Sequence, residues 1–505
     1  MTSPIKKIPD DVSLTMSSQK VEYFSRNEIK FDSNPIRISL TVTLVFTWIC
    51  LGLNNEIIPP CVKGLIENTD SNMERFGFVM SIRGVGYFLG SVLGGMFADL
   101  FPNLMILQHS IALGLFAISC FTIPLCHQID QMSAAFFLAG FAHAMLTSSG
   151  NPLISRVWNN RSKGVFNLIH SGYGFGAILT PILIYLMYKS NFLDNDSKTS
   201  ILNSSIGNTT QTENYVPAFY VVGLYSGIMA IVTFAIFLFL LLSQRRKHFL
   251  IFGDTVPEKE VITSLLLSDK SGIRWFIEKT FTRLKAIYTR NRSNKSSKLI
   301  IFIVFLVYCN LIGNDKVTNK YLYVYIDSTS NTTTTQGKDS LIVQMSYWIG
   351  FSLTRFISFF LLKKIPIFIL YQIHLCMALL VTIILNFFNL NRIGVIIIFI
   401  LFAIIKAPLY PTGMGLLLMN GNISGLIVMV INIGSSIGAT LYPYLAGYLI
   451  KKYNPNVYTN ILFTTAIAIF VFGTLYTQLL RCQINRDKVK KLEIMAELSS
   501  VKTES

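Results

Sequence analysis

Charged residues are scarce in this chain of 505 residues: Asp, Glu, Lys and Arg together make up 14% of it, whereas a soluble domain carries about 25%. The shortage excludes an ordinary soluble fold, because long stretches of the chain offer no polar surface to water. The seven cysteines are scattered and form no closely spaced pairs of the kind that bind zinc. The sequence therefore predicts a membrane protein with no metal site.

Catalytic motifs are also missing. The chain has no glycine-rich phosphate loop ending in Lys-Ser/Thr and no HExxH motif, and its histidines lie in separate segments. Its longest polar loop has about 55 residues, near the lower limit for a domain, which leaves no room for the nucleotide-binding domain of an ATP-driven pump. We therefore expect neither an enzyme nor an organic cofactor.

Long apolar runs dominate what is present. Each run has about 20 residues, the length that an α-helix needs to cross a bilayer, while a membrane β-barrel would need alternating segments of about ten. About 36 polar residues precede the first run, so it is interpreted as a span and not as a cleavable signal. The sequence predicts an all-α polytopic membrane protein with twelve transmembrane helices, at residues 38–57, 77–98, 104–126, 132–154, 165–188, 217–243, 299–321, 340–362, 367–388, 394–417, 424–449 and 459–480.

The distribution of basic residues predicts the orientation. Lysine and arginine are retained on the cytoplasmic side, and about 30 of the 43 lie in segments that share a side with the N-terminus. Both termini are therefore expected in the cytoplasm, with the plasma membrane as the expected location. The net charge of +17 then requires no nucleic acid partner.

The polar segments also predict the domain boundaries. Apolar and basic residues at 273–290 fall on different faces of a possible helix, as in a helix that lies on a membrane surface, although a disordered linker fits equally well. The expected divisions are a cytoplasmic N-tail 1–36, a six-helix bundle 37–243, a basic cytoplasmic linker 244–298, a second six-helix bundle 299–481 and a cytoplasmic C-tail 482–505.

Two features belong to the predicted outer surface. Cys61 and Cys126 fall near it and would be exposed to oxidising conditions, but sequence alone leaves a disulfide between them open. Four further sequons would lie inside, so glycosylation motifs support the orientation only weakly. The candidate glycosylation sites on the outer side are Asn195, Asn203, Asn208 and Asn331.

The second half of the chain repeats the first at an offset of about 260 residues. Four pairs of spans align in order, which makes chance similarity of apolar residues a poor explanation. Six helices repeated in parallel are typical of transporters whose binding site lies between the halves at mid-membrane. The aligned pairs include Asn55-Glu56 with Asn314-Asp315, His143 with Lys406, His170 with Asn432, Gly172 with Gly434, Gly176 with Gly438, and Pro181 with Pro443.

Several of these segments also resemble a known family. GGMFAD at 94–99, together with six plus six spans and a basic linker, resembles the major facilitator superfamily over residues 37–481. Leu100, Phe101 and Pro102 replace the basic residues that usually follow this motif. LGSVLGG at 89–95, IHSGYGFGAILTPIL at 169–183 and APLYPTG at 407–413 are similar to its sodium-dependent glucose transporter 1-like branch, also called major facilitator superfamily domain-containing protein 4 and related to fucose permeases. The resemblance implies a secondary transporter that works by alternating access on a hexose-like solute.

Small residues at helical spacing predict close helix contacts. Helices in a bilayer associate through tight packing, which glycines four residues apart permit. Such a seam would either pack statically or allow the helices to slide. The expected packing residues are Gly86, Gly90, Gly94, Gly172, Gly176, Gly434 and Gly438.

Polar residues inside the spans mark a candidate site. An ionisable group at the bilayer centre costs about 2.5–3.5 kcal/mol on insertion scales, so it faces a cavity or a partner and not lipid. A neutral polyol is bound by amides, imidazoles, hydroxyls and aromatic faces, whereas Lys406 and Arg355 would also suit an anion. The expected substrate-binding residues, in a central cavity, are His143, Asn151, His170, Asn310, Trp348, Arg355, Lys406, Tyr410 and Asn432.

A second set of residues is expected in coupling or gating. Glu56, Asp315, His143 and His170 are the plausible proton carriers, and Glu56 could instead pair with Arg83. Sodium would need oxygen ligands, and a uniporter would need neither ion. The coupling and gating candidates are Asn55, Glu56, Arg83, Asp99, Asn314 and Asp315.

Three functions remain open on the sequence. The first is secondary transport of a hexose-like or other small polar solute by a monomeric unit in the lipid bilayer, with sodium or proton coupling or none. The second is a transporter-like sensor or scaffold that binds a solute without moving it. The third is a carrier of lipids or organic anions.

Overall fold

The computed structural model describes residues 34–159, 162–198, 215–252, 295–328, 338–388, 390–420, 423–453 and 457–503. The first half contains α2 (Asn34–Glu56), α3 (Ile58–Asn68), α4 (Met73–Leu100), α5 (Met105–Thr122), α6 (Ile129–Trp158), α7 (Ser162–Lys198) and α8 (Val216–Phe252). The second half contains α11 (Lys295–Ser328), α12 (Lys338–Leu361), α13 (Ile367–Phe387), α14 (Arg392–Lys406), α15 (Leu409–Leu417), α16 (Gly425–Lys452) and α17 (Val457–Thr503).

Within these ranges, eleven helical stretches are long and apolar enough to cross a membrane. Helix α12 occupies the eighth predicted span and completes the twelve, so the predicted all-α membrane fold is confirmed. Several helices run past their predicted bounds, as α7 and α8 do, and two spans differ most from the prediction. The tenth is interrupted between Lys406 and Leu409, and the twelfth continues through most of the predicted C-tail to Thr503.

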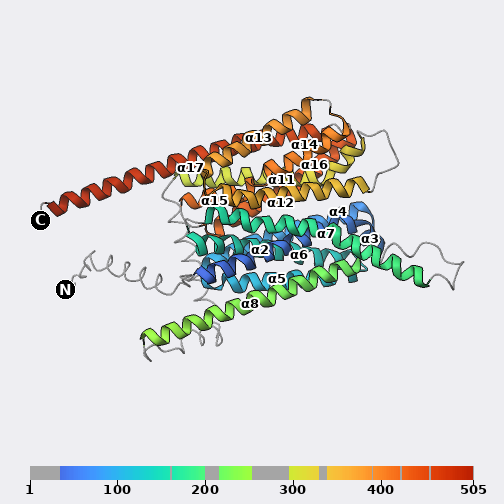
Figure 1. Ribbon diagram of the computed structural model, residues 1–505, viewed down its shortest axis with the longest axis horizontal. Helices are drawn as coiled ribbons and strands as arrows, with labels where there is room; N and C mark the ends of the chain where they lie inside the picture. Colours follow the sequence, from blue (N-terminus) through green and yellow to red (C-terminus); the bar gives the residue numbers. More distant parts are fainter. Residues whose placement is uncertain are drawn as a thin grey trace, which may run out of the picture.

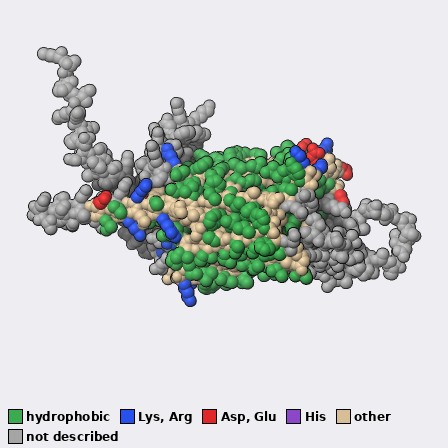
Figure 2. Space-filling model, turned by 90° about the horizontal axis from the view of Figure 1, so that it is seen from above, with side chains coloured by type: hydrophobic (Ala, Val, Ile, Leu, Met, Phe, Trp, Pro, Cys, Tyr) green, Lys and Arg blue, Asp and Glu red, His purple; other side chains and the backbone are tan. Residues whose placement is uncertain are grey.

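The two halves form two bundles that lie side by side along their whole length (Figure 1). Helix α2 begins and α17 ends at the same end of the molecule, which we call the terminal end. Hydrophobic side chains cover the visible middle of the surface, and charged side chains lie at the two ends (Figure 2). Ile231 on α8, for example, is 71% exposed. This apolar belt is the surface that lipid would cover.

The glycine pairs of the repeat make equivalent contacts in both halves. Gly172 and Gly176 of α7 lie against the backbone of α2, and Gly434 and Gly438 of α16 lie against the backbone of α11. A side chain at Gly434, for instance, would place its Cβ 2.7 Å from the Phe305 carbonyl oxygen. The two equivalent glycine pairs in the sequence therefore form the same kind of helix contact in each half.

A further glycine stripe packs inside the first half. Gly86 and Gly90 of α4 lie against the backbone of α6 at Phe137 and Phe141, and Gly94 lies beside Met145. These close approaches join helices of one half, as do the repeated pairs. They favour static packing of helices within a half over a glycine-lined contact at which the two halves slide.

Other predicted features of the outer surface and the linker have different outcomes. Cys61 and Cys126 are both free and buried, in one apolar cluster. The possible helix at 273–290, residues 1–33 of the predicted N-tail and the sequons other than Asn195 lie outside the described residues. Asn195 lies near the end of α7.

Candidate functional site

The interruption of the tenth span produces free backbone groups in the middle of the second bundle. Pro411 has no N–H, so the carbonyl oxygen of Ala407 loses its partner within the helix. The Arg355 side chain of α12 supplies a replacement, because its Nε donates to Ala407 O at 2.7 Å. Further donors serve this segment: Tyr308 OH reaches Tyr410 O at 2.9 Å, Tyr476 OH reaches Gly413 O at 3.0 Å, and His374 Nδ1 reaches Ile405 O at 2.6 Å.

Arg355 also joins the two halves. Its Nη1 donates to the backbone oxygen of His170 in α7 at 3.0 Å. The guanidinium lies over the ring of Phe351, 4.0 Å from its centroid, and the residue is buried. Arg355 therefore meets two carbonyl oxygens and an aromatic face, but no carboxylate is among these contacts.

The hydrogen bonds of His170 define its tautomer. Trp48 Nε1 can only donate, and it donates to His170 Nδ1 at 3.2 Å. The proton therefore lies on Nε2, which donates to Asn151 Oδ1 at 3.1 Å. The Asn151 amide is oriented by this bond, and its Nδ2 has no hydrogen-bond partner. The ring of Tyr410, from the other half, lies 5.2 Å from the imidazole.

Asn432, the repeat counterpart of His170, links the halves in a similar way. Its Nδ2 donates to Thr147 Oγ1 at 3.0 Å and to Ser148 Oγ at 3.2 Å, both on α6. Its Oδ1 has no partner, although the residue is fully buried. Each half thus contributes an asparagine with one unpaired polar atom.

More unpaired polar atoms lie on the helices that line the contact between the halves, where α7 packs along α12 and α4 along α16. Ser352 of α12 lies directly against Gly174 of α7, and Tyr347 packs with Ala177 of α7. A buried polar group without a partner in the protein is usually satisfied by an ordered water or a ligand. We call this set the polar seam; it consists of Asn151 Nδ2, Tyr347 OH, Ser352 Oγ, Asn432 Oδ1 and Ser435 Oγ.

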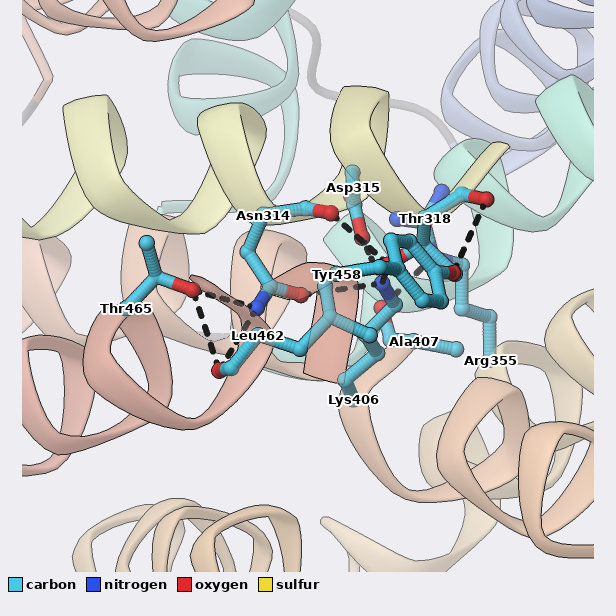
Figure 3. A network of polar contacts seen from close by, with 9 residues as sticks. All are labelled: Asn314, Asp315, Thr318, Arg355, Lys406, Ala407, Tyr458, Leu462 and Thr465. Carbon is cyan, nitrogen blue, oxygen red and sulfur yellow. Dashed lines mark hydrogen bonds and ion pairs between the residues drawn. The ribbon is translucent and has the colours of Figure 1, made fainter. Parts of the chain in front are cut away.

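Lys406 is engaged inside the second half (Figure 3). Its Nζ lies 2.7 Å from Asp315 Oδ1 and 3.2 Å from both Asn314 Oδ1 and Thr318 Oγ1. All three partners are on α11. The ion pair joins the broken tenth span to the seventh, and it neutralises both charges within the bundle.

The first half contains a related group around Asn55. Arg83 Nη2 donates to Asn55 Oδ1, and Asn55 Nδ2 lies 3.5 Å from His143 Nδ1. Glu56 accepts a hydrogen bond from Tyr173 OH at 2.9 Å. Arg83 and Glu56 therefore reach different partners in the structure, and a direct pair between them is not among these contacts.

At the terminal end, Asp99 connects the halves. Its carboxylate accepts from Gly425 N at 2.6 Å and from Leu426 N at 2.8 Å, at the start of α16. Free N–H groups at a helix start favour a negative charge. The backbones of Gly95 and Gly425 approach closely beside this contact. Asp99 therefore links the two halves although no basic residues follow it directly in the sequence.

Two more contacts close the terminal end. Ile423 N donates to Ser155 Oγ at 3.1 Å, and Asn167 Nδ2 donates to Thr412 Oγ1 at 3.1 Å. The structure therefore holds the halves together at the terminal end and at mid-length.

The remaining candidates lie at various distances from the seam. Trp348 packs on Tyr173 across the halves, with ring centroids 5.8 Å apart. Asn310 is satisfied within the second half, because Tyr442 OH donates to its Oδ1 at 2.8 Å. In the described ranges, no three His, Cys, Asp or Glu side chains converge as a metal site would require.

Three residues of the seam were not among the candidates from the sequence: Tyr347, Ser352 and Ser435. A signal exists for the two serines. Ser352 precedes Arg355 by three residues, and Ser435 follows Asn432 by three, so each shares a helix face with a polar candidate.

Comparisons with curated proteins agree with the motifs. The protein named sodium-dependent glucose transporter 1 of Xenopus laevis is 21% identical over 428 residues, or 83% of this chain and 78% of that protein. The human protein of that name is 24% identical over 206 residues, and the match spans only 39% of its length. Human major facilitator superfamily domain-containing protein 4A is 26% identical over 156 residues, 30% of each chain.

Solved structures share the fold. The E. coli fucose:proton symporter FucP superimposes with a TM-score of 0.58 at 14% identity, covering 87% of this chain and 99% of that one. The proton:xylose symporter XylE, bound to 6-bromo-6-deoxy-D-glucose, gives a TM-score of 0.60 at 11% identity, with 88% and 96% covered. The family model described as Major Facilitator Superfamily matches residues 44–443. With a match across most of its length and two six-helix bundles related by a repeat, this chain belongs to the major facilitator superfamily.

Proposed function

We propose that the protein is a secondary transporter that binds a small neutral polyhydroxylated solute, such as a hexose, at the polar seam and moves it by alternating access between its two halves. The unit is a single chain, both termini are cytoplasmic, and the plasma membrane is the location. Each of these points follows the sequence predictions above and is open to test.

One observation carries the choice of substrate class. The charged groups near the seam already have partners: Lys406 pairs with Asp315, and Arg355 bonds to two carbonyl oxygens. The unpaired atoms that make up the polar seam are an amide N–H, an amide oxygen and three hydroxyls. Amides and hydroxyls both donate and accept, as a sugar requires, whereas an anion would need a free positive charge.

The arrangement of bonds between the halves supports alternating access. Helix N-terminal N–H groups of α16 hold Asp99 at the terminal end, while Asn432 and Arg355 join the halves at mid-length. If the terminal end is cytoplasmic, this structure is closed toward the cytoplasm. Breaking a few hydrogen bonds at one end would allow the halves to rock about the seam.

The names of the relatives agree with a sugar. Three of them are named for glucose, fucose or xylose transport. The relatives' names include both sodium and proton coupling, so the proposal does not specify the coupling ion.

Proteoliposomes containing the purified protein would test the proposal. Uptake of labelled sugars, nucleosides, amino acids and organic acids would be measured with sodium and pH gradients imposed separately. We expect saturable uptake of a sugar, lowered in Asn151→Ala and Asn432→Ala. Binding of a sugar without uptake would favour a sensor, and uptake of organic acids alone would contradict the neutral seam.

A further inference from the structure

The Lys406 ammonium lies in a shell of oxygen atoms that come from one helix (Figure 3). A carboxylate oxygen of Asp315 is 2.7 Å from Nζ, and the amide oxygen of Asn314 and the hydroxyl of Thr318 are each 3.2 Å away. Carboxylate, carbonyl and hydroxyl oxygens are also the ligands that hard metal cations prefer. We infer that Lys406 occupies, as a built-in cation, the position of a co-transported monovalent ion, so that the protein binds no sodium at Asp315.

Neighbouring groups hold these oxygens in place. Asn314 Nδ2 donates to Thr465 Oγ1 at 2.8 Å and to Leu462 O at 3.3 Å, which turns the amide oxygen toward Lys406. Thr318 Oγ1 donates its proton to the backbone oxygen of Asn314 at 2.7 Å, so that its lone pairs face the ammonium. The shell is therefore built to accept a cation, whichever cation fills it.

Charge limits the shell to one cation. Lys406 and Asp315 neutralise each other, and Lys406 is buried with its Nζ 4.4 Å from the centroid of the Phe402 ring. A metal ion in the same shell would meet the ammonium at short range in a medium of low dielectric constant, without a second carboxylate to compensate. Removing the amine, in contrast, would leave a half-buried carboxylate, with its Oδ1 shielded from solvent, that a small cation could neutralise.

The first half repeats the arrangement with other cationic or basic groups. His143 and Asn55 stand where the repeat places Lys406 and Asn314, and their side chains lie 3.5 Å apart. The guanidinium of Arg83 donates to the Asn55 oxygen. In each half, the asparagine oxygen that could ligate a mobile ion thus faces a fixed side-chain cation.

Salt-dependent stability tests this inference without knowledge of the substrate. Purified full-length protein would be heated in sodium chloride and in choline chloride at equal ionic strength. We expect the wild type to unfold at the same temperature in both salts. Lys406→Met keeps the unbranched stem but removes the charge, and we expect sodium to raise its unfolding temperature by several degrees over choline.

Two matched variants control the measurement. Lys320→Met makes the same change elsewhere on α11, where the ammonium lies over the Tyr321 ring, and it should respond equally to both salts. Adding Asp315→Asn to Lys406→Met removes the anionic ligand and should abolish the sodium effect. If Lys406→Met can be purified only in sodium, that result supports the inference.

The inference would be overturned if sodium specifically stabilised the wild type, or if Lys406→Met responded identically to both salts. It would also be overturned if Lys406→Met folded in neither salt while the variant with both Lys406→Met and Asp315→Asn folded. The inference rests on the proposed function only where it concerns coupling, since it implies that uptake is independent of sodium. A protein that transports no sugar but shows the expected salt pattern would contradict the proposed function alone.

Discussion

At the scale of single residues, a substitution of Tyr347 should weaken solute binding without lowering the stability of the protein. Its hydroxyl is buried without a partner, so Tyr347→Phe removes an unsatisfied group and should leave the free energy of unfolding unchanged or raise it by about 1–3 kcal/mol. In the proposed site the same change removes a hydrogen bond to the solute, which should raise KM about fivefold. Uptake kinetics and thermal unfolding would measure the two effects.

Tyr225→Phe is the matched control for this change. Its hydroxyl donates to Phe46 O at 2.9 Å, away from the seam, so its loss should lower stability by about 1 kcal/mol and leave KM unaltered. Unchanged transport in Tyr347→Phe would remove this hydroxyl from the binding site.

Arg355 should not tolerate replacement by lysine. The guanidinium reaches Ala407 O and His170 O at the same time, and an ammonium cannot reproduce this fork. We expect Arg355→Lys to lower the transport rate about tenfold or more, since one lost hydrogen bond to a charged group costs about 1.5–3 kcal/mol. Arg481→Lys, at an exposed position over the Phe368 ring, should transport normally. Equal transport rates for both variants would contradict the role of Arg355 in joining the halves.

The residue types of the site could be read from the sequence, but their partners could not. Asn314-Asp315 and Lys406 were both selected as polar groups inside spans, yet their contact depends on how α14 is rotated and where it breaks. Hydropathy and spacing give the depth of a residue in the membrane and the face of its helix. They do not say which neighbouring helix that face meets.

At the scale of the helices, glycine contacts should determine the stability of each half. Gly176→Ala would place a Cβ inside van der Waals contact of the Ile49 carbonyl oxygen, and backbone cannot move away cheaply. We expect a loss of about 1–3 kcal/mol, as for other overpacked sites, detected by thermal unfolding in detergent. Gly114→Ala, with open space around it, should instead stabilise α5 by up to about 1 kcal/mol; similar losses in both would contradict the contact.

Helix boundaries show what local sequence can predict. The twelve spans were predicted because a run of apolar residues reports its own environment. The break at Ala407 was not, because prolines such as Pro408 and Pro411 often only kink a membrane helix. Here the side chains of Arg355, His374 and two tyrosines satisfy the exposed carbonyls. The extension of α17 beyond residue 480 was missed because charged residues in a helix leave no hydropathy signal.

At the scale of the whole molecule, Asp99 should control the balance between the two ends. Its carboxylate accepts two backbone N–H bonds across the halves, each worth about 1.5–3 kcal/mol as a bond to a charged group. Asp99→Ala removes both while preserving the bundles, whose cores lie elsewhere. The population that is open at the terminal end should therefore rise about tenfold or more.

Spin labels at the exposed residues Leu242 of α8 and Ile369 of α13, one on each half, would measure this opening as longer distances between the labels. Asp130→Ala, which removes an exposed carboxylate from the first turn of α6 at the opposite end, should leave the distances unchanged. If Asp99→Ala also left them unchanged, the contacts of Ser155 and Asn167 would be enough to hold the terminal end closed. The same variant should then transport at the wild-type rate, whereas a latch of the proposed strength would alter it.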